Sequence, residues 1–276
     1  MPSLYVISCR MFEDELVHIF EEEDKDARVI LIENENIEGI EKKFSEVGIK
    51  YEKTSVEDLP LKLGPKEDFI VVLNILEFAL DANPSLLKDK VYTSIEETGK
   101  YFNGILVFYG LCGNVLGSLE KDFSYMDIPV RILKDACGNI VDDCICASFD
   151  NRDAYVNAVM GETRGEGTYF LTPMQAANWR EMLVLAKLAP DPDDTEMMKM
   201  VFDYSGYKNV GKVDTGLSYE KDFGSIVDEF ASLFDFEKRL FSGSTKISDE
   251  CYHSIKKYIV ENVTAESSVE GEACKN

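Results

Sequence analysis

The sequence predicts an α/β fold in which helices cover both faces of one or more mainly parallel sheets. Short apolar runs of strand type alternate with segments of helical periodicity along nearly all of the 276 residues, a pattern typical of parallel sheets. Hydrophobic residues make up 45% of the chain, which is enough for a sizeable core. Three junctions, near residues 4, 105 and 168, share the order strand, small-residue turn and helix. This order suggests repeated strand-turn-helix lobes, although the three sequences differ too much to establish a duplication.

In the amino-terminal half, each apolar run is followed by a segment of helical periodicity. The first such segment places Phe12, Leu16 and Phe20 on one face, and the acidic residues 13–15 in its first turn favour the helix dipole. The second ends at Gly48, a residue suited to a helix C-cap. We expect strands at residues 4–8, 28–32, 69–73 and 105–109, and helices at 12–20, at 37–48, from 76 with a break near 83–84, at 91–99, and after the turn at 110–113.

The carboxyl-terminal half continues the alternation. Pro173 is placed for the first turn of a helix, and Gly138 and Asn139 suit a tight turn with positive φ. We expect strands at residues 129–133, 165–172, 209–213 and 236–241, and helices around 155–159, from 173, at 222–234 and at 248–260. Residues 1–262 are therefore expected to form a single α/β domain, which could consist of two lobes. Residues 263–276 are expected to form a disordered acidic tail.

The charge balance excludes several classes of partner. The chain has 52 acidic and 29 basic residues and a net charge of −23, so its surface repels phosphate backbones and anionic lipid. Apolar runs of about 18 residues are absent from the sequence, and the amino terminus lacks a basic leader region. We therefore expect a cytoplasmic protein that binds neither nucleic acid nor membrane, and that could form homo-oligomers or bind a basic partner protein.

Three of the seven cysteines form the strongest chemical pattern. Cys9 and Cys112 each follow a predicted strand, and the carboxyl ends of parallel strands share one edge of a sheet. Cys144 follows two aspartates and could join them. Three thiolates on separate loops suit zinc with one open coordination position, or an iron–sulfur cluster. The ordinary interpretation of each cysteine is a buried apolar thiol, and an odd number in a cytosolic setting makes a disulfide scaffold improbable.

The glycine-rich turn around Cys112 is a second candidate for ligand binding. Gly110, Gly113 and Asn114 are the residues we expect to hold a cofactor there, because small residues allow a close approach. Their spacing matches neither a Rossmann motif nor a P-loop, yet a helix N-terminus at this turn could hold an anion. The pair Asp142 and Asp143 has two interpretations. The two aspartates either ligate a metal or accept hydrogen bonds from its ligands, or they form an ordinary turn or helix N-cap.

The sequence argues against two kinds of catalytic site. Asp214-Thr-Gly216 matches the aspartic-protease tripeptide, but that chemistry needs two such loops and the chain has one. The chain has two histidines, both in helical segments, which disfavours a Cys–His or Ser–His pair. No catalytic residue is assigned from the sequence.

Four segments together resemble the uncharacterised DUF1638 family, in the form typical of methanogenic archaea. The resemblance covers most of residues 3–255, and it implies a cysteine at each of Cys9, Cys112 and Cys144. It further implies a link to corrinoid-dependent methyl transfer, with a corrinoid protein or methyltransferase as partner. The segments are Ile7-Ser-Cys-Arg-Met-Phe-Glu-Asp-Glu-Leu16, Tyr109-Gly-Leu-Cys-Gly-Asn114, Val141-Asp-Asp-Cys-Ile145 and Gly167-Thr-Tyr-Phe-Leu-Thr-Pro-Met174.

One position departs from the family pattern. Relatives carry a histidine in the segment that corresponds to residues 74–84, where this chain has none, so Asp81 stands in for it or the position is open. The leading hypothesis is a zinc protein with a three-cysteine site that serves methyl transfer in one-carbon metabolism. The alternatives are a non-enzymatic accessory module for corrinoid methyltransferase proteins and an iron–sulfur protein.

Overall fold

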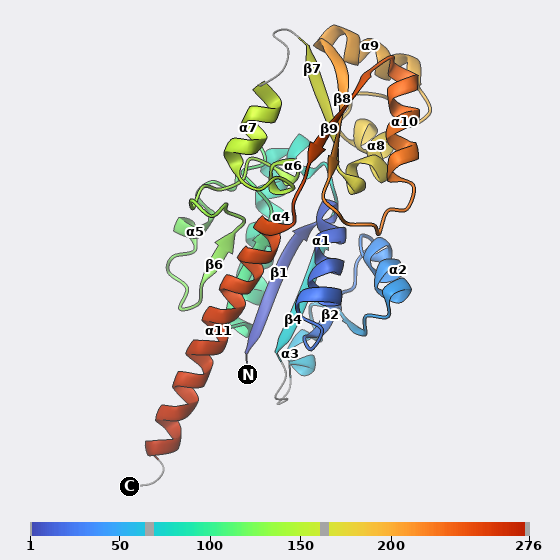
Figure 1. The fold of residues 1–276 in the computed structure, drawn as a ribbon. Helices are drawn as coiled ribbons and strands as arrows, with labels where there is room; N and C mark the ends of the chain where they lie inside the picture. Colours follow the sequence, from blue (N-terminus) through green and yellow to red (C-terminus); the bar gives the residue numbers. More distant parts are fainter. Residues whose placement is uncertain (1, 64–68, 161–165, 274–276) are drawn as a thin grey trace.

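The predicted fold class is confirmed, because all pairs of named strands are parallel. The computed structural model describes residues 2–63, 69–160 and 166–273, with side chains of the last helix described as far as Val263. The strands of the first sheet are β1 (Ser3–Cys9), β2 (Arg28–Ile32), β3 (Tyr51–Thr54), β4 (Ile70–Leu76), β5 (Gly104–Phe108) and β6 (Val130–Ile132). Their order across the sheet is β3-β2-β4-β1-β5-β6 (Figure 1).

Strand β1 lies inside the first sheet, and all seven of its residues are buried. It pairs with β4 on one side, where Cys9 is level with Leu76, and with β5 on the other, where Ser8 is level with Phe108. The three neighbouring strands therefore end at the same edge. A central strand buried on both faces explains the continuous apolar run in the sequence.

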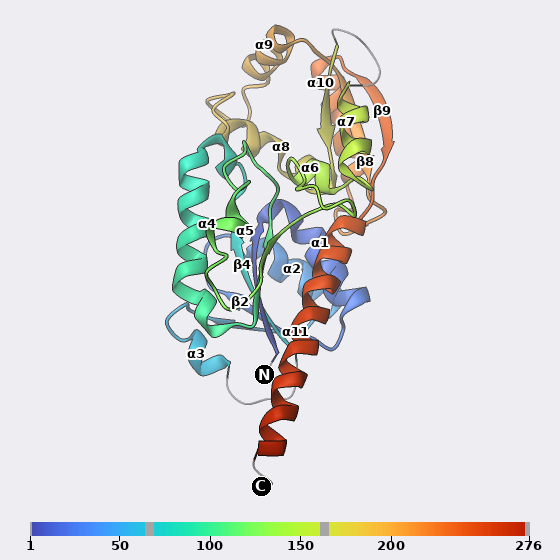
Figure 2. The same cartoon turned by 90° about the vertical axis from the view of Figure 1, so that its left-hand side faces the viewer.

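Helices cover both faces of the first sheet. Helix α4 (Pro84–Thr98) lies on one face, and α1 (Glu13–His18), α2 (Glu38–Val47) and α11 (Lys246–Ala273) lie on the other (Figure 2). Helix α11 packs so closely that a β-carbon on Gly104 would lie 2.8 Å from Ile259. The last helix of the chain thus completes the core of the first sheet. Two short helices, α3 (Leu59–Lys62) and α5 (Leu119–Asp122), lie in the connections.

The second sheet consists of β7 (Gly167–Leu171), β8 (Tyr207–Asp214) and β9 (Glu237–Ser242), in that order. One face packs against α8 (Pro173–Leu185), α9 (Thr195–Ser205) and α10 (Phe223–Phe234) through an aromatic core that includes Trp179, Phe202 and Phe230. The other face packs against α6 (Cys144–Ala147) and α7 (Arg152–Met160), around Phe149 and Phe170.

The carboxyl ends of the two sheets face each other. In Figure 1 the arrowheads of β1 and β9 point toward one another across the middle of the molecule. The contact includes a hydrogen bond of 2.6 Å from the Tyr219 hydroxyl to Glu21, and an ion pair of 2.7 Å between Lys43 of α2 and Glu220. Ligand sites in parallel sheets lie beyond the carboxyl ends of the strands, so this junction is the place to look for one.

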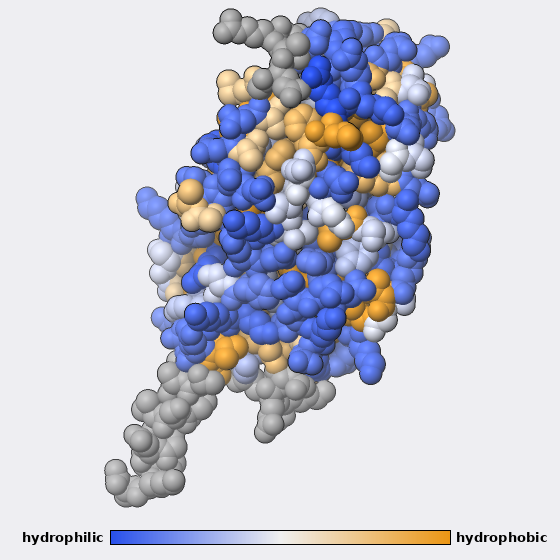
Figure 3. Space-filling view, in the orientation of Figure 1, coloured by the Kyte–Doolittle hydropathy of each residue, from blue (hydrophilic) through white to orange (hydrophobic). Residues whose placement is uncertain are grey.

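The surface agrees with the charge balance of the sequence. Hydrophilic residues cover most of the face drawn in Figure 3. No helix in the described part of the chain is long and apolar enough to cross a membrane.

Several predicted elements differ from the structure. The helix expected directly after the glycine-rich turn is wrong: residues 109–118 form a loop with turns, and α5 begins only at Leu119. The break expected near residues 83–84 is confirmed, because Asn83 separates the 3₁₀ turn Leu80–Ala82 from α4 and caps α4 by accepting a hydrogen bond from the Leu86 amide. The helical turns expected from residue 76 begin only at Leu80, and α4 includes the short helix expected at 91–99. The sequence patterns missed β3, α3 and α9. Helix α11 extends into the expected tail at 263–276, of which residues 274–276 lie outside the described part.

Candidate functional site

The structure brings Cys9, Cys112 and Cys144 together around one cavity of about 120 Å³. The cavity lies at the carboxyl edge of the first sheet, where that edge meets α6 and α8. Asp81 also lines it, from the loop after β4, and so does Gln175 from α8. The lining thus combines residues at or after the carboxyl ends of β1, β4 and β5 with residues of α6, which precedes β7 in the chain, and of α8, which follows it.

Cys9 is held in place by strand β1. It is the last residue of the strand and keeps an extended conformation, with φ −63° and ψ 140°. The chain then turns into a short 3₁₀ segment, Arg10–Phe12, of which Met11 and Phe12 also line the cavity. Cys9 is therefore buried at the edge of the core of the first sheet and lines the cavity from there.

Cys112 is presented by a loop with an unusual backbone. Cys112, Gly113 and Asn114 have consecutive positive φ values of 44°, 75° and 67°. Such values are unfavourable for residues other than glycine and cost about 1–2 kcal/mol. Two hydrogen bonds hold the loop, from the Leu111 amide to Val141 O at 2.8 Å and from the Cys112 amide to Asp142 O at 2.9 Å.

Gly110 explains how the Cys112 and Cys144 segments come so close. A β-carbon at Gly110 would lie 2.5 Å from Val141 O and 2.8 Å from Asp143 N. Only glycine allows this approach, so the glycine brings two protein segments together. Gly110, Gly113 and Asn114 are not among the residues that line the cavity. Their role in cofactor binding stays a prediction. The helix N-terminus that was expected at this turn to hold an anion is not there, because the next helix, α5, begins at Leu119.

Cys144 is the first residue of α6, and two aspartates precede it. Asp143 caps the helix by accepting a hydrogen bond of 2.7 Å from the Cys146 amide, and it accepts another of 3.0 Å from the Tyr155 hydroxyl. Asp142 instead pairs with Arg152 at 3.1 Å. The N-cap interpretation therefore holds for Asp143, which also lines the cavity.

Electrostatics around the cavity favour a cation. Burial raises the pKa of Cys9 to about 12, and burial with the nearby Cys9 sulfur raises the pKa of Cys112 and Cys144 still further. The carboxylate of Asp81 contributes in the same direction for all three thiols. Among the described residues that line the cavity there is no lysine, arginine or histidine. Among these lining residues, three thiols and two carboxyl groups thus lack a positive partner.

Gln175 and Tyr109 are two polar residues at the cavity that the sequence patterns did not identify. The Gln175 amide donates a hydrogen bond of 3.1 Å to the Cys144 sulfur, while its Oε1 is buried and without a partner among the described residues. The Tyr109 hydroxyl lies beside Cys9 and is likewise buried without a hydrogen bond of normal geometry in the described chain. Nothing in the spacing of Gln175 distinguishes it from other residues of a helix start, so no sequence signal could have identified it.

Within the described ranges, no group of three or more His, Cys, Asp or Glu side chains has the arrangement of a formed metal site. The three thiols share a cavity but do not converge on one point. Three other cysteines lie elsewhere: Cys137 is exposed, Cys146 is buried, and the Cys251 thiol bonds to Lys134 O at 3.3 Å. Met11 and Met182 add two thioether sulfurs to the cavity lining.

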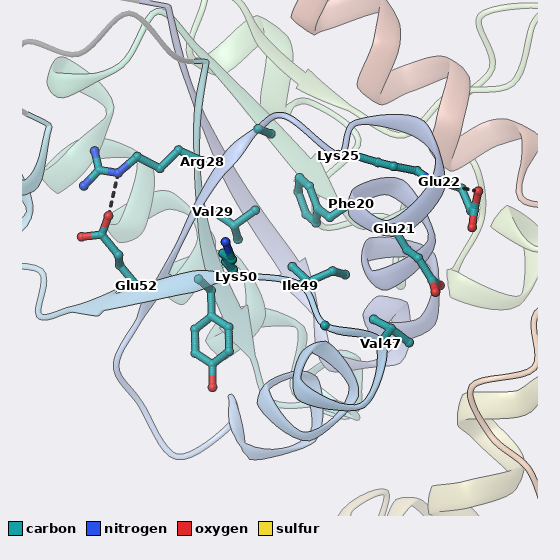
Figure 4. A pocket seen from close by; sticks show the side chains of 13 residues that line it. Phe20, Glu21, Glu22, Lys25, Arg28, Val29, Val47, Ile49, Lys50 and Glu52 are labelled. Atoms are coloured by element: carbon teal, nitrogen blue, oxygen red, sulfur yellow. Dashed lines mark hydrogen bonds and ion pairs between the residues drawn. The ribbon is translucent and has the colours of Figure 1, made fainter.

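A larger pocket, of about 660 Å³, lies at the opposite edge of the first sheet (Figure 4). Phe20, Val29 and Ile49 line it, near the starts of β2 and β3, and paired charges such as Arg28 and Glu52 stand at its rim. It contains no thiol or other nucleophile with an unusual environment. Its size alone therefore does not make it the site of chemistry.

A family model described as "Protein of unknown function (DUF1638)" matches residues 75–252. The matched range includes Asp81, Cys112, Cys144 and Gln175 of the cavity, and it excludes Cys9. No curated protein matches the sequence.

Proposed function

We propose that this chain, which belongs to the DUF1638 family of proteins of unknown function, binds a soft metal ion through Cys9, Cys112 and Cys144. The observation that carries the proposal is that these cysteines, which are far apart in the sequence, line one small buried cavity. Thiolate sulfur is the ligand that zinc, copper(I) and iron–sulfur clusters prefer. Zinc is the first candidate, since three protein ligands leave its fourth position open.

The charge pattern of the cavity supports this donor set. Burial of a thiol without a neighbouring cation favours the protonated form, which is why the pKa of each of the three cysteines is raised. A bound divalent cation reverses this preference and takes the thiols as thiolates. Metal binding would therefore release protons and compensate Asp81 and Asp143, whose carboxyl groups line the same cavity.

The neighbouring polar side chains support a defined orientation of the thiols. Gln175 donates to the Cys144 sulfur, and a donor to sulfur stabilises the thiolate over the thiol. The unpartnered Gln175 Oε1 and Tyr109 hydroxyl are available to bind a water molecule or a small ligand at the open position. Metal binding requires the three cysteine side chains to move so that their sulfurs meet at a common point.

The size of the cavity limits what can react there. About 120 Å³ accommodates an ion with a water molecule or a small thiol, whereas a corrinoid ring is far too large. A methyl group carried on a corrinoid would have to be delivered by a partner protein docked at the junction between the sheets. A metal at this site would act as a Lewis acid and lower the pKa of a bound thiol or water.

Two forms of the proposal differ in turnover. In the first, the chain transfers a methyl group from a corrinoid-protein partner to a small thiol. In the second, it is an accessory module that uses the metal site to bind the same kind of partner. An assay of methyl transfer from methylated corrinoid protein to a thiol acceptor distinguishes the two forms. Repeated turnover supports the first form, and a stoichiometric complex with the corrinoid protein but no turnover supports the second.

The first test is the metal content of anaerobically purified protein. We expect about one zinc per chain, lost in Cys112→Ser and retained in Cys137→Ser, which removes an exposed thiol outside the cavity. Iron with a brown colour, lost in the same variant, would identify an iron–sulfur protein instead of a zinc protein. The proposal fails if zinc-supplemented wild type binds no metal, or if removal of all three thiols leaves the metal content unchanged.

A further inference from the structure

Asp81 lies at the mouth of the cysteine cavity. Among the described residues that line the cavity, it is the only exposed one, and the others are buried or half-buried. Cys9 and Cys112 are buried, and Cys144 is half-buried. The three thiols therefore lie further inside than Asp81, and a small molecule that reaches them from solvent passes this residue.

The local backbone fixes the position of Asp81. Ala79 has a positive φ of 56°, which turns the chain away from β4, and Asp81 lies in the 3₁₀ turn Leu80–Ala82 that follows. Leu80 anchors this turn because it is buried in the core of the first sheet. A positive φ is unfavourable for alanine, and strained residues of this kind cluster at functional sites. The turn thus holds Asp81 at the mouth of the cavity.

The carboxylate of Asp81 acts on the inside of the cavity. Burial is the largest cause of the raised pKa of Cys9, Cys112 and Cys144, and the negative charge of Asp81 raises all three further. Asp143, which also lines the cavity, contributes in the same direction for Cys112 and Cys144. Because Coulomb energy falls with distance, both carboxylates lie within electrostatic reach of the thiols. The potential inside the cavity is therefore negative.

No positive side chain opposes these two carboxylates among the described residues of the lining. Arg10 is adjacent to Cys9 in the sequence, but its guanidinium carbon lies 5.1 Å from the centre of the Phe78 ring and it pairs with Glu13 at 3.4 Å. None of Arg10, Phe78 and Glu13 lines the cavity. Bound zinc would not reverse the sign, because three thiolates outweigh the charge of a zinc dication. The cavity is thus negative with or without the metal.

We propose that Asp81 determines which small thiol enters the cavity, by admitting neutral and positively charged thiols and excluding anionic ones. The inference rests on the function proposed above, because it concerns the thiol that binds beside the metal. Phe12, Leu80 and Ile145 give the cavity apolar walls for a short aliphatic chain. Asp81 attracts an ammonium at the outer end of such a chain, whereas a carboxylate or sulfonate there meets the same charge without a counter-ion. The acceptor class is therefore a short aminothiol or hydroxythiol.

The first test uses the metal-free full chain, so that its result does not depend on metal binding. The protein is treated with (2-aminoethyl) methanethiosulfonate, a cation, or (2-sulfonatoethyl) methanethiosulfonate, an anion, and mass spectrometry of digested protein gives the rate of modification of each cysteine. The ratio of the two rates at the exposed Cys137 is the reference. We expect Cys112 to favour the cation more than Cys137 does. Asp81→Asn should lower this preference about tenfold, because the lost charge acts on the two reagents in opposite directions.

Glu77→Gln is the matched control, because Glu77 follows β4 in the same loop and does not line the cavity. We expect this variant to keep the wild-type preference at Cys112, and circular dichroism checks that each variant is folded. The proposal is overturned if Cys112 of wild type favours the cation no more than Cys137 does. It is also overturned if Asp81→Asn and Glu77→Gln change the preference equally.

The second test uses the chain loaded with cobalt(II), whose thiolate absorption bands report both the metal and an added thiol. The probes are cysteamine and 3-mercaptopropionate. Because these thiols differ in their own acidity, the ratio of their dissociation constants in wild type is compared with the ratio in Asp81→Asn. We expect the variant to shift the ratio toward 3-mercaptopropionate by about tenfold. An unchanged ratio overturns this inference and leaves the metal site standing, whereas absence of the bands overturns the metal site, and the first test then decides on Asp81.

Discussion

The Lys43 ammonium of α2 lies 2.7 Å from the carboxylate of Glu220, in the segment between β8 and α10, and so joins the two sheets through a buried ion pair. The same ammonium lies 2.7 Å from Asp14 and 3.2 Å from Glu13, both in α1. The sequence places these two acids in the first turn of a helix, where they favour its dipole, and the structure shows in addition that they are almost fully buried. One lysine therefore compensates carboxylates from both parts of the molecule.

Replacement of Lys43 should destabilise the fold strongly. In Lys43→Met the carboxylates of Glu13 and Asp14 remain buried without their partner, and loss of one member of a buried ion pair costs about 3–5 kcal/mol. Urea unfolding measures the change in the free energy of unfolding. Lys221→Met is the control, because its ion pair with Glu46 also joins the two parts but is exposed, so we expect a loss of no more than about 1 kcal/mol. Equal losses in the two variants would contradict this account.

Stability should fall as the pH rises toward 8. Burial, with the nearby charge of Asp14, raises the pKa of Glu15 from 4.5 to about 8. The folded state therefore holds a proton that the unfolded state releases, and the stability present below about pH 4.5 is lost progressively up to about pH 8. Glu15→Gln should unfold at higher urea concentration than wild type at pH 8, with little difference near pH 4.5. A variant that follows the wild-type curve across this range would show that Glu15 does not titrate there.

Gly110→Ala should separate the two segments that carry Cys112 and Cys144. The added β-carbon would lie 2.5 Å from Val141 O, so the backbone must move, at a cost of about 1–3 kcal/mol. We expect lower stability in urea and weaker zinc binding. Gly224→Ala is the control, because its β-carbon meets only the Lys212 ammonium at 3.9 Å and alanine is favourable in a helix. If Gly110→Ala retains both stability and zinc, the close approach is not required.

Alkylation of metal-free protein should distinguish the cavity thiols from the exposed one. The thiolate is the nucleophile, and burial raises the pKa of Cys9, Cys112 and Cys144, so iodoacetamide should modify them slowly at pH 7.5. Cys137 is exposed and should react first. Mass spectrometry of digested protein at successive times gives the order of reaction. Fast modification of Cys112 in folded, metal-free protein would contradict the environment described for the cavity.

The sequence predicts the strands better than the loops that build the site. Apolar runs identify β1, β4 and β5 because these strands are buried on both faces. The edge strand β3 is polar, which hides it from the same pattern. The position of Cys9 and Cys112 at one sheet edge follows from parallel strands alone. The sequence predicts a helix after the turn at 110–113, whereas the loop continues to residue 118, because closely spaced glycines do not reveal that Gly110 contacts another backbone.

Contacts between distant segments account for what the sequence could not predict. Gln175 reaches Cys144 only because α8 lies against the edge of the first sheet. The burial of Glu13 and Asp14 depends on their ion pairs with Lys43, which is far away in the sequence. Local periodicity reports which residues share a face of a helix, and it carries no information about which other element will cover that face.

The position of α11 has a consequence for synthesis of the protein. Tyr252, Ile255 and Ile259 belong to the core of the first sheet, although the whole second sheet lies between them and β6 in the chain. The strands of the first sheet therefore remain incompletely covered until α11 has been synthesised. Such long-range contacts slow folding, and exposed strands of a partly made chain are prone to aggregate. The order of the elements along the chain thus delays completion of the first core until after the second sheet has been made.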